Sequence, residues 1–211
     1  MRWRGLALHL VVMARAPRLG AVKRRLARDV GDMAAWNFYR HGLASLLHRL
    51  GRDRRWCCWL AVTPDRAAVA DWPPAWRPIV QGPGDLGARM GRLLRELPPG
   101  PVVIVGSDIP DLGPVHVARA FALLGDHDWV FGPATDGGYW LIGARRRPAR
   151  RHPFAGVRWS SPQALADTLA NLSGANPPAA RVAFLEELRD VDTVADWRRW
   201  RRKIKRPSSA P

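Results

Sequence analysis

The sequence predicts an α/β protein with a mostly parallel, layered sheet. Short runs of branched apolar residues alternate with amphipathic stretches, and Gly or Pro marks most boundaries between them. The most apolar run, 101–106, has no polar residue between Val102 and Val105, as is typical of a strand buried on both faces. A chain of 211 residues is long enough for one sizeable core. We therefore expect a single domain over residues 1–202, followed by a basic flexible tail at 203–211.

The individual elements follow from the same patterns. Three helices are expected where apolar residues recur at helical spacing and Gly or Pro follows: 32–50, 85–97 and 114–124. Capping boxes, Ser160 with Gln163 and Thr193 with Asp196, mark the starts of two later helices. Strands are expected at 6–13, 56–63, 78–81, 101–106, 128–133 and 138–143.

Charge and cysteine content restrict the class of protein. Lys plus Arg total 34 against 18 for Asp plus Glu, a formal net charge of +16, which favours anionic partners. The arginines are spread along the whole chain, so a general arginine bias explains the charge equally well. Two adjacent cysteines, Cys57 and Cys58, exclude a disulfide scaffold and a Cys-rich zinc site, and they indicate a reducing cytoplasm. The apolar N-terminal stretch is interpreted as a first strand rather than a signal peptide, and no run is long enough to span a membrane.

Asp108 follows the most apolar strand almost directly, in the sequence VIVGSDIPDL. Asp and Pro are common turn residues, so the simplest interpretation is that this segment ends the strand. The alternative is chemical, because open α/β sheets bind ligands at the carboxyl ends of their parallel strands.

Two loops carry residue types that suit a bound phosphate. The segment 13–27 follows the first strand and combines Gly20 with basic residues at a helix start, which suits phosphate but is also typical of a solvated turn. The segment 81–90 places three glycines around Asp85 before a helix. Glycines permit close approach of a ligand, although an ordinary helix-capping turn has the same composition.

A second acid lies in the turn of segment 129–145, which carries Asp136-Gly137-Gly138 between two strands. Asp-Gly in this position predicts a hairpin. Asp136 and Asp108 are also a candidate pair of ligands for Mg²⁺ or Mn²⁺, because these ions prefer oxygen ligands and bind substrate phosphates.

Six motifs in the same order resemble a bacterial family, the radical-SAM/selenodomain-associated transferases. They cover nearly the whole chain and read ARAPRLGAVKRRL, QGPGDLGARM, VIVGSDIPDL, FGPATDGGYWLIG, FAGVRWSS and LRDVDTVADW. The resemblance implies the GT-A nucleotide-diphospho-sugar transferase fold, a three-layer Rossmann-like arrangement. The chain is also similar, more distantly, to 2-phospho-lactate and molybdenum-cofactor guanylyltransferases.

The resemblance implies that the basic loop contacts nucleotide phosphates. Four of its residues are expected to contribute: Arg15, Gly20, Lys23 and Arg25. The family usually has Lys where this chain has Arg15, and Thr where it has Arg24, so the geometry of the phosphate loop is expected to differ from the family pattern.

The other implied site residues lie in the acidic turns and in the glycine-rich loop. Asp108 stands where GT-A proteins place a metal-binding acid, and Asp136 occupies the second acidic turn of the family. Both are expected to bind the metal and to act in catalysis. Asp85 and Gly87 lie in the loop that is expected to border the base or ribose of the nucleotide.

The favoured function is therefore a Mg²⁺- or Mn²⁺-dependent cytoplasmic transferase that uses a nucleotide-activated donor, with glycosyl transfer to a small-molecule acceptor preferred. Asp190 and Asp192 of the DVDT motif are candidates for facing the acceptor, although helix capping explains them more simply. One alternative is nucleotidyl transfer from an NTP with release of pyrophosphate. A third hypothesis is a non-catalytic, basic nucleic-acid-binding protein, but no motif for specific nucleic-acid recognition is present.

Overall fold

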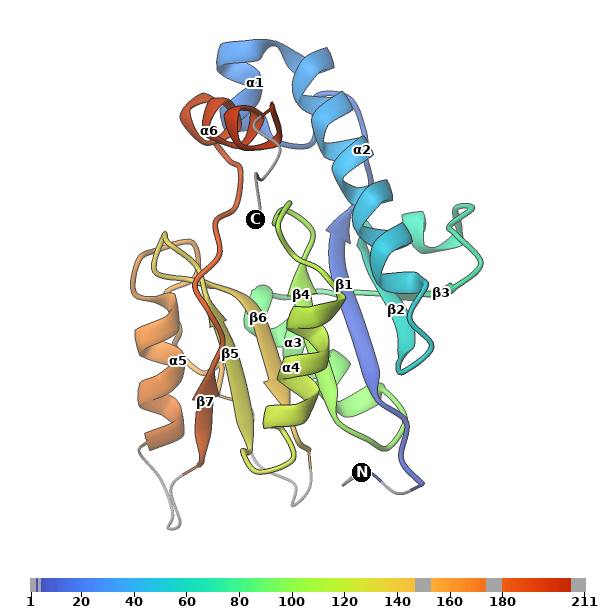
Figure 1. Cartoon of the computed structure of the whole chain (residues 1–211), viewed down its shortest axis with the longest axis vertical. Helices are drawn as coiled ribbons and strands as arrows, with labels where there is room; N and C mark the ends of the chain where they lie inside the picture. Colours follow the sequence, from blue (N-terminus) through green and yellow to red (C-terminus); the bar gives the residue numbers. More distant parts are fainter. Residues whose placement is uncertain (1–2, 4, 147–152, 174–179, 206–211) are drawn as a thin grey trace, which may run out of the picture.

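A seven-stranded sheet forms the centre of the protein in its computed structural model, which describes residues 3, 5–146, 153–173 and 180–205 (Figure 1). The strand order is β3-β2-β1-β4-β6-β5-β7. β6 runs antiparallel to its neighbours β4 and β5, and the other pairs are parallel, so the predicted mostly parallel sheet is confirmed. The strands are β1 (His9–Arg15), β2 (Cys57–Thr63), β3 (Trp76–Val80), β4 (Val102–Gly106), β5 (Trp129–Pro133), β6 (Tyr139–Ala144) and β7 (Val182–Phe184).

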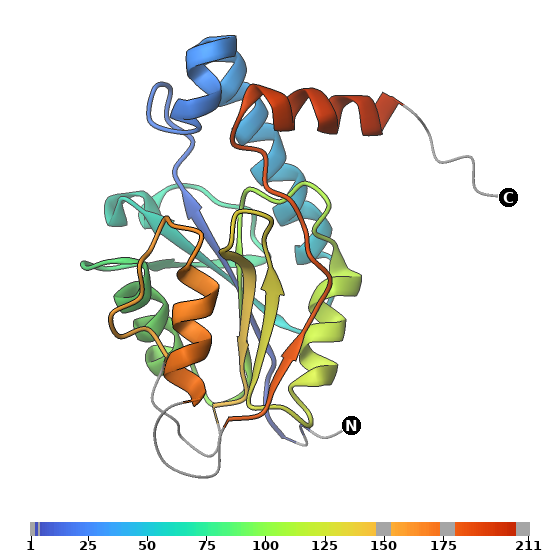
Figure 2. The same ribbon diagram turned by 90° about the vertical axis from the view of Figure 1, so that its left-hand side faces the viewer.

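Helices cover both faces of this sheet, which gives the three-layer arrangement that the family resemblance implies (Figures 1 and 2). α2 and α4 lie on one face, and α3 and α5 lie on the other. The helices are α1 (Arg24–Val30), α2 (Asp32–Gly51), α3 (Leu86–Glu96), α4 (Pro114–Leu123), α5 (Ala164–Ser173) and α6 (Val194–Lys205), with a 3₁₀ helix η1 (Asp65–Val69).

Two apolar cores follow from this layering. Alternate residues of β4 enter opposite cores: Val103 and Val105 pack with α2 and α4, whereas Val102 and Ile104 pack with α3. A strand that is buried on both faces needs apolar residues at every position. This requirement explains the unbroken apolar run that identified β4 in the sequence.

The strand order changes direction beside β1. The chain moves from β1 outward to β2 and β3, and then returns to place β4 on the other side of β1. Such a switch point opens a crevice at the carboxyl ends of the strands, where ligands bind in open α/β sheets. Arg15 ends β1, and Asp108 follows β4 at this edge. α1 and α6 lie beyond the same edge, with α6 running across this end of the molecule (Figure 2).

The structure corrects several expectations at the ends of elements. The six expected strands are present with boundaries shifted by up to three residues, but β7 was not predicted because it has three partly exposed residues. α6 continues to Lys205, so residues 203–205 are helical rather than part of the tail; 206–211 lie outside the described residues.

The two predicted capping boxes have different outcomes. The Thr193 box is formed, since Thr193 N donates to Asp196 Oδ2 (3.0 Å) and Asp196 N donates to Thr193 Oγ1 (3.3 Å). The Ser160 box is wrong, because Ser160 has a left-handed backbone (φ 58°), and Ser161 Oγ accepts from Gln163 N instead. Within the described segments, no helix is both long and apolar enough to cross a membrane.

Candidate functional site

A lysine shared by two carboxylates lies at the switch point of the sheet. Lys23 Nζ is 3.0 Å from Asp108 Oδ2 and 2.7 Å from Asp192 Oδ1. These residues come from the loop after β1, the loop after β4 and the segment before α6, so the fold joins three distant parts of the chain here. The lysine side chain is only 4% exposed, whereas each carboxylate is 39% exposed. The acids are thus reachable from solvent while the cation that they share is not.

The local backbone turns Lys23 inward. Lys23 precedes α1 as its N-cap residue with φ 49° and ψ 43°, a left-handed conformation that is uncommon outside glycine. Burial disfavours the charged ammonium, but Asp108 and Asp192 outweigh that effect and raise the pKa of Lys23 above its usual value. The lysine is therefore charged throughout the physiological range.

Asp108 is fixed by the loop around it. Ser107 Oγ donates to Asp108 Oδ1 at 3.3 Å, and the main-chain N–H of Val191 donates to the carbonyl oxygen of Asp108 at 3.3 Å. The second bond attaches the 190–192 segment along the Asp108 loop, which brings Asp192 to the lysine. Asp192 therefore belongs to the site and not to the helix cap, which Thr193 and Asp196 form.

Tyr39 of α2 holds the two central strands where they separate. β1 pairs with β4 only as far as Met13, so the main chain of Arg15 has no partner in β4. The Tyr39 hydroxyl accepts from Arg15 N (2.9 Å), donates to Arg15 O (3.0 Å) and lies 3.2 Å from Ser107 Oγ. Burial raises the pKa of Tyr39 to about 12, with the Asp108 charge acting in the same direction, so the hydroxyl keeps its proton. Tyr39 is thus a positioning residue for both sides of the crevice.

The cluster lies at the wall of a cleft of about 760 Å³. Five cationic side chains and three acidic ones line it, which gives an excess of positive charge suited to a polyanion. The predicted site residues among them are Arg15, Lys23, Arg25, Asp85 and Asp108, and the acid that joins them is Asp192.

The opposite wall comes from the glycine-rich loop and α3. Asp85 is the N-cap of α3 and accepts from Ala88 N at 2.8 Å, so its capping role is confirmed at the edge of the cleft. Arg89 Nε donates to Gly84 O (3.0 Å), and its Nη1 donates to Gln81 Oε1 (3.3 Å). Trp159 also lines the cleft, and its indole Nε1 is buried without a hydrogen-bond partner in the described parts of the chain.

Asp136 does not line this cleft. β5 and β6 form the hairpin that its Asp-Gly sequence predicts, and Asp136 Oδ1 accepts from Gly138 N at 2.9 Å within the turn. The carboxylate of Asp136 is therefore used locally, and Asp192 takes the place beside Asp108 that was expected for Asp136. Asp136 still lies close enough to the DVDT segment to influence Asp190.

The two glycines predicted as nucleotide-binding residues have different environments. Gly20 lies in the turn before Lys23 with φ +72°, next to the lining residues of the cleft but not among them. Gly87 is buried in α3, where a Cβ atom would lie 2.7 Å from Phe154 Cβ and 2.8 Å from Trp159 Cζ2. Its role in the structure is to let α3 approach Trp159, and through that residue to shape the wall.

Asp190 is a further acid beside the cluster. Burial, and then the charges of Asp192 and Asp136, raise the pKa of Asp190 to about 6. Its carboxyl therefore titrates near neutral pH, unlike an ordinary aspartate.

Sequence reasoning named Asp192 only as a candidate for facing the acceptor, missed its pairing with Lys23, and did not identify Tyr39 as a site residue. Asp192 stands in the quoted DVDT motif, but its partner Lys23 is 169 positions away, and no local pattern connects them. Tyr39 is one apolar position in an amphipathic helix, and nothing in the sequence separates its role from core packing. Trp159 and Arg89 stood in quoted motifs, FAGVRWSS and QGPGDLGARM, without an assigned role.

The side chains that line this cleft supply only some of the ligands that a divalent metal ion needs. Across the residues that the structure describes, no group of three or more His, Cys, Asp or Glu side chains is placed to hold a metal ion. Asp108 and Asp192 nevertheless gather around one cationic atom and are partly exposed. One or two carboxylates are sufficient for Mg²⁺ when substrate phosphates supply further oxygens.

Comparison with solved structures places the fold among nucleotide-dependent transferases. A structure from Desulfovibrio desulfuricans G20, named "putative nucleotide-diphospho-sugar transferase", is 31% identical, with 96% of this chain and 90% of that chain covered and a TM-score of 0.85. Two others share the fold at lower identity. The 4-diphosphocytidyl-2C-methyl-D-erythritol synthase of Anaerococcus prevotii DSM 20548 is 10% identical (TM-score 0.59; 97% and 99% covered). The glucosyl-3-phosphoglycerate synthase of Mycobacterium tuberculosis, in complex with Mn²⁺, UDP and glucosyl-3-phosphoglycerate, is 13% identical (TM-score 0.53; 93% and 76% covered).

The family of the chain follows from its sequence. No curated protein matches it, and the association with radical-SAM proteins stays a prediction. Residues 46–161, more than half of the chain, match a family described as "Uncharacterized protein conserved in bacteria (DUF2064)". The chain belongs to the DUF2064 family, and its fold is that of the nucleotide-diphospho-sugar transferases.

Proposed function

We propose that the chain is a transferase that uses a nucleotide-activated donor, with glycosyl transfer favoured over nucleotidyl transfer. The observation that carries this proposal is the Lys23–Asp108–Asp192 cluster, which lies in a cationic cleft at the switch point of the sheet. A similar protein of 31% identity bears the name of a nucleotide-diphospho-sugar transferase, which supports the same class of donor.

In this proposal the donor's diphosphate lies at the cationic side of the cleft. Lys23, Arg15 and Arg25 supply positive charge there, and guanidinium groups match the geometry of phosphate oxygens. The nucleoside lies toward α3, where the guanidinium of Arg89 offers hydrogen-bond donors and Trp159 offers an aromatic surface. Transfer leaves negative charge on the departing diphosphate, and fixed cations around that position stabilise the transition state.

Asp108 and Asp192 would hold a divalent cation together with the donor's phosphates. When bound, the ion would act as a Lewis acid that neutralises charge on the leaving group. We assign the second carboxylate to Asp192 rather than to the originally expected Asp136, because Asp136 is outside the lining of the cleft. Since Lys23 already compensates part of the negative charge of the two acids, we expect the ion to bind weakly until a nucleotide is present.

Glycosyl transfer is favoured for two reasons. The loop between β1 and α1 contains a single glycine, Gly20, and lacks the glycine-rich fingerprint that is common in sugar nucleotidyltransferases. The resemblance in the ordered motifs also extends to a family of glycosyltransferases. Nucleotidyl transfer uses the same cations, so the released product must separate the two reactions.

The decisive experiment is a binding and product panel. Calorimetry with UDP-, GDP-, ADP- and CDP-sugars and with NTPs, each with and without Mn²⁺, identifies the donor. Incubation of the bound donor with a pool of cell metabolites then shows whether a nucleoside diphosphate or pyrophosphate is released.

Variants give this panel its controls. Asp108→Asn should abolish the Mn²⁺-dependent part of donor affinity, whereas Asp53→Asn, which removes an acid paired with Arg55 far from the cleft, should not. Pyrophosphate release from an NTP would establish nucleotidyl transfer instead. Absence of any Mn²⁺-dependent nucleotide binding would refute the proposal.

A further inference from the structure

A second cavity of about 580 Å³ lies on the other side of the Asp108 loop, between α2 and α6. It shares four lining residues with the donor cleft: Lys23, Tyr39, Ser107 and Asp108. The two cavities therefore adjoin at the lysine–carboxylate cluster. A transferase needs two substrates to meet at one point, and this arrangement provides two spaces that meet there.

The walls of the second cavity differ from those of the donor cleft. Aromatic and apolar side chains dominate: Phe38 comes from α2, Ile109 from the loop, and Trp197 and Trp200 from α6. Phe38 and Trp200 meet edge to face with ring centroids 5.1 Å apart, so α6 closes one side of the cavity against α2. Such walls suit a flat or extended apolar body and are poorly matched to a nucleotide diphosphate.

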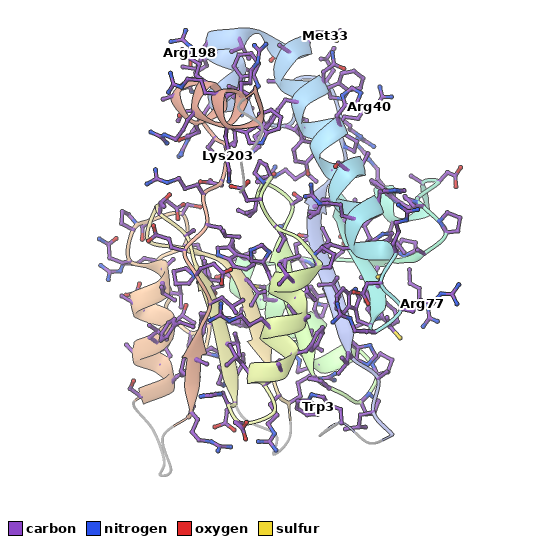
Figure 3. The ribbon with its side chains drawn as sticks, viewed as in Figure 1. Trp3, Met33, Arg40, Arg77, Arg198 and Lys203 are labelled. Atoms are coloured by element: carbon purple, nitrogen blue, oxygen red, sulfur yellow. The ribbon has the colours of Figure 1, made fainter. Side chains whose placement is uncertain are left out.

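The charges around this cavity are unequally compensated. Its two acids each have a lysine partner: Asp108 pairs with Lys23, and Asp111 lies 2.9 Å from Lys203 Nζ. Figure 3 shows Lys203 and Arg198 at the end of the molecule that α1 and α6 form.

The two lining arginines have no such acid. Arg201 lies over the Trp197 ring at 4.7 Å and has no ion-pair partner in the described part of the chain. Arg49 Nη2 donates to the carbonyl oxygens of Pro110 and Leu112, while its Nε is buried without a hydrogen-bond partner among the described residues. The uncompensated charge is therefore positive.

Building on the proposed donor site, we infer that this second cavity binds the acceptor, and that the acceptor is a small anionic molecule with an apolar, aromatic or extended body. The body lies against the rings of Phe38 and Trp200, and the acidic group interacts with Arg201. An ionised oxygen of the acceptor forms the new bond to the donor, and the donor's bond to its phosphate oxygen breaks with the electron pair leaving on that oxygen. Because the attacking oxygen carries no proton, the step needs no general base.

Two fluorescent probes of matched shape test the chemistry of the cavity. 8-Anilinonaphthalene-1-sulfonate has an aromatic body and an anionic group, and N-phenyl-1-naphthylamine has a similar body without the charge. The wild-type protein should bind the anionic probe saturably and at least several times more tightly than the neutral one. Equal affinity for both probes, or no saturable binding, would overturn the inference.

Variants locate the binding. Phe38→Ala should weaken the anionic probe about tenfold, the effect of losing one aromatic contact. Arg201→Gln should weaken the anionic probe and leave the neutral probe unchanged. The matched control is Phe184→Ala, because Phe184 is 48% exposed on β7 and is not a lining residue of the cavity. Equal loss in Phe184→Ala and Phe38→Ala would place the probe elsewhere.

A last measurement separates this inference from the donor proposal. Donor affinity in calorimetry should be unchanged by Phe38→Ala, while donor consumption with the metabolite pool should fall in that variant. If no donor binds but the two probes still bind as described, the donor proposal and the acceptor role are both refuted. The second cavity would then remain a binding site for an anionic ligand of another role. Full donor consumption in Phe38→Ala would refute the acceptor assignment alone. If Arg201→Gln instead reduces binding to duplex DNA and leaves the anionic probe unchanged, α6 is a nucleic-acid contact and the inference is wrong.

Discussion

Lys23→Met removes the ammonium group that Asp108 and Asp192 share, while it keeps an unbranched side chain of similar length. The two carboxylates then face each other without a compensating cation. An exposed ion pair contributes about 0–1 kcal/mol, whereas removal of one partner from a buried pair costs about 3–5 kcal/mol. The cluster lies between these limits, because the lysine is 4% exposed and each acid is 39% exposed.

We therefore expect Lys23→Met to lower the free energy of unfolding by about 2–3 kcal/mol, or the Tm by about 5–10 °C for a chain of this size. Urea and thermal unfolding in the presence of a chelator measure this loss. The matched control is Lys203→Met, whose partner Asp111 lies at a similar distance and is similarly exposed, but the Lys203 side chain is 66% exposed whereas that of Lys23 is 4% exposed. The control should lose at most about 1 kcal/mol.

The same variant tests the assignment of the cation site. If Asp108 and Asp192 hold a divalent ion, millimolar Mn²⁺ should restore much of the stability lost in Lys23→Met, because the ion occupies the position of the missing ammonium. The wild type and Lys203→Met should respond little in the absence of nucleotide. A Lys23→Met protein with wild-type stability, or one that Mn²⁺ does not stabilise more than the control, would refute the reasoning.

Three other predictions follow from single contacts. Asp190 has a pKa raised to about 6, so its folded form holds a proton that the unfolded chain releases near pH 4, and stability falls as the pH rises between these values. In the presence of a chelator, Asp190→Asn should therefore raise the free energy of unfolding above pH 6 by about 1–2 kcal/mol, a value discounted for the partial exposure of Asp190, and leave it unchanged at pH 4. A gain of equal size at both pH values would contradict this. Tyr39→Phe leaves the main-chain N–H and C=O of Arg15 unpaired, so it should lower the free energy of unfolding in urea by about 1–3 kcal/mol and also weaken donor affinity. Unchanged donor affinity would show that Tyr39 is not a positioning residue. Gly87→Ala should destabilise the protein by about 1–2 kcal/mol in thermal unfolding, because the new Cβ would lie 2.7 Å from Phe154 Cβ, whereas Gly42→Ala, in a helix with open space around it, should stabilise the protein slightly. Similar effects of both changes would show that the packing around Gly87 adapts.

Most of the fold could be predicted from the sequence because the patterns that predict helices, strands and turns are local. The unbroken apolar run of β4, the Asp-Gly turn between β5 and β6, and the Thr193 capping box all depend on residues within a few positions of each other. Asp108 could be placed at a sheet edge for the same reason. The Ser160 box was wrong although its pattern was present, because Ser160 has a left-handed backbone conformation and the hydroxyl that accepts from Gln163 N belongs to Ser161.

The site was less predictable because its contacts are distant in the chain. Lys23 and Asp108 were both named, but the sequence does not show that a third acid, Asp192, completes the cluster. Asp136 was chosen as that acid since it also follows a strand. The turn that makes it conspicuous in the sequence is also what occupies its carboxylate, through the N–H of Gly138.

The position of Lys23 joins stability to function in a way that affects every experiment on this site. Its ion pair with Asp192 connects the loop after β1 to the segment before α6, and its ion pair with Asp108 connects the same loop to the loop after β4. The segment before α6 is also attached to Asp108 through the Val191 N–H. A donor phosphate that pairs with Lys23 would therefore weaken the Lys23–Asp192 ion pair, which helps to hold α6 near α2. α6 forms a wall of the second cavity, so the shape of that cavity would change as well. Occupation of the donor cleft and the shape of the acceptor cavity would then depend on each other through one buried ammonium group. Affinity for the anionic probe should accordingly change when donor is bound, and by reciprocity donor affinity should change by the same factor when probe is bound. Identical probe affinity with and without saturating donor would show that the two cavities, although they adjoin, act independently.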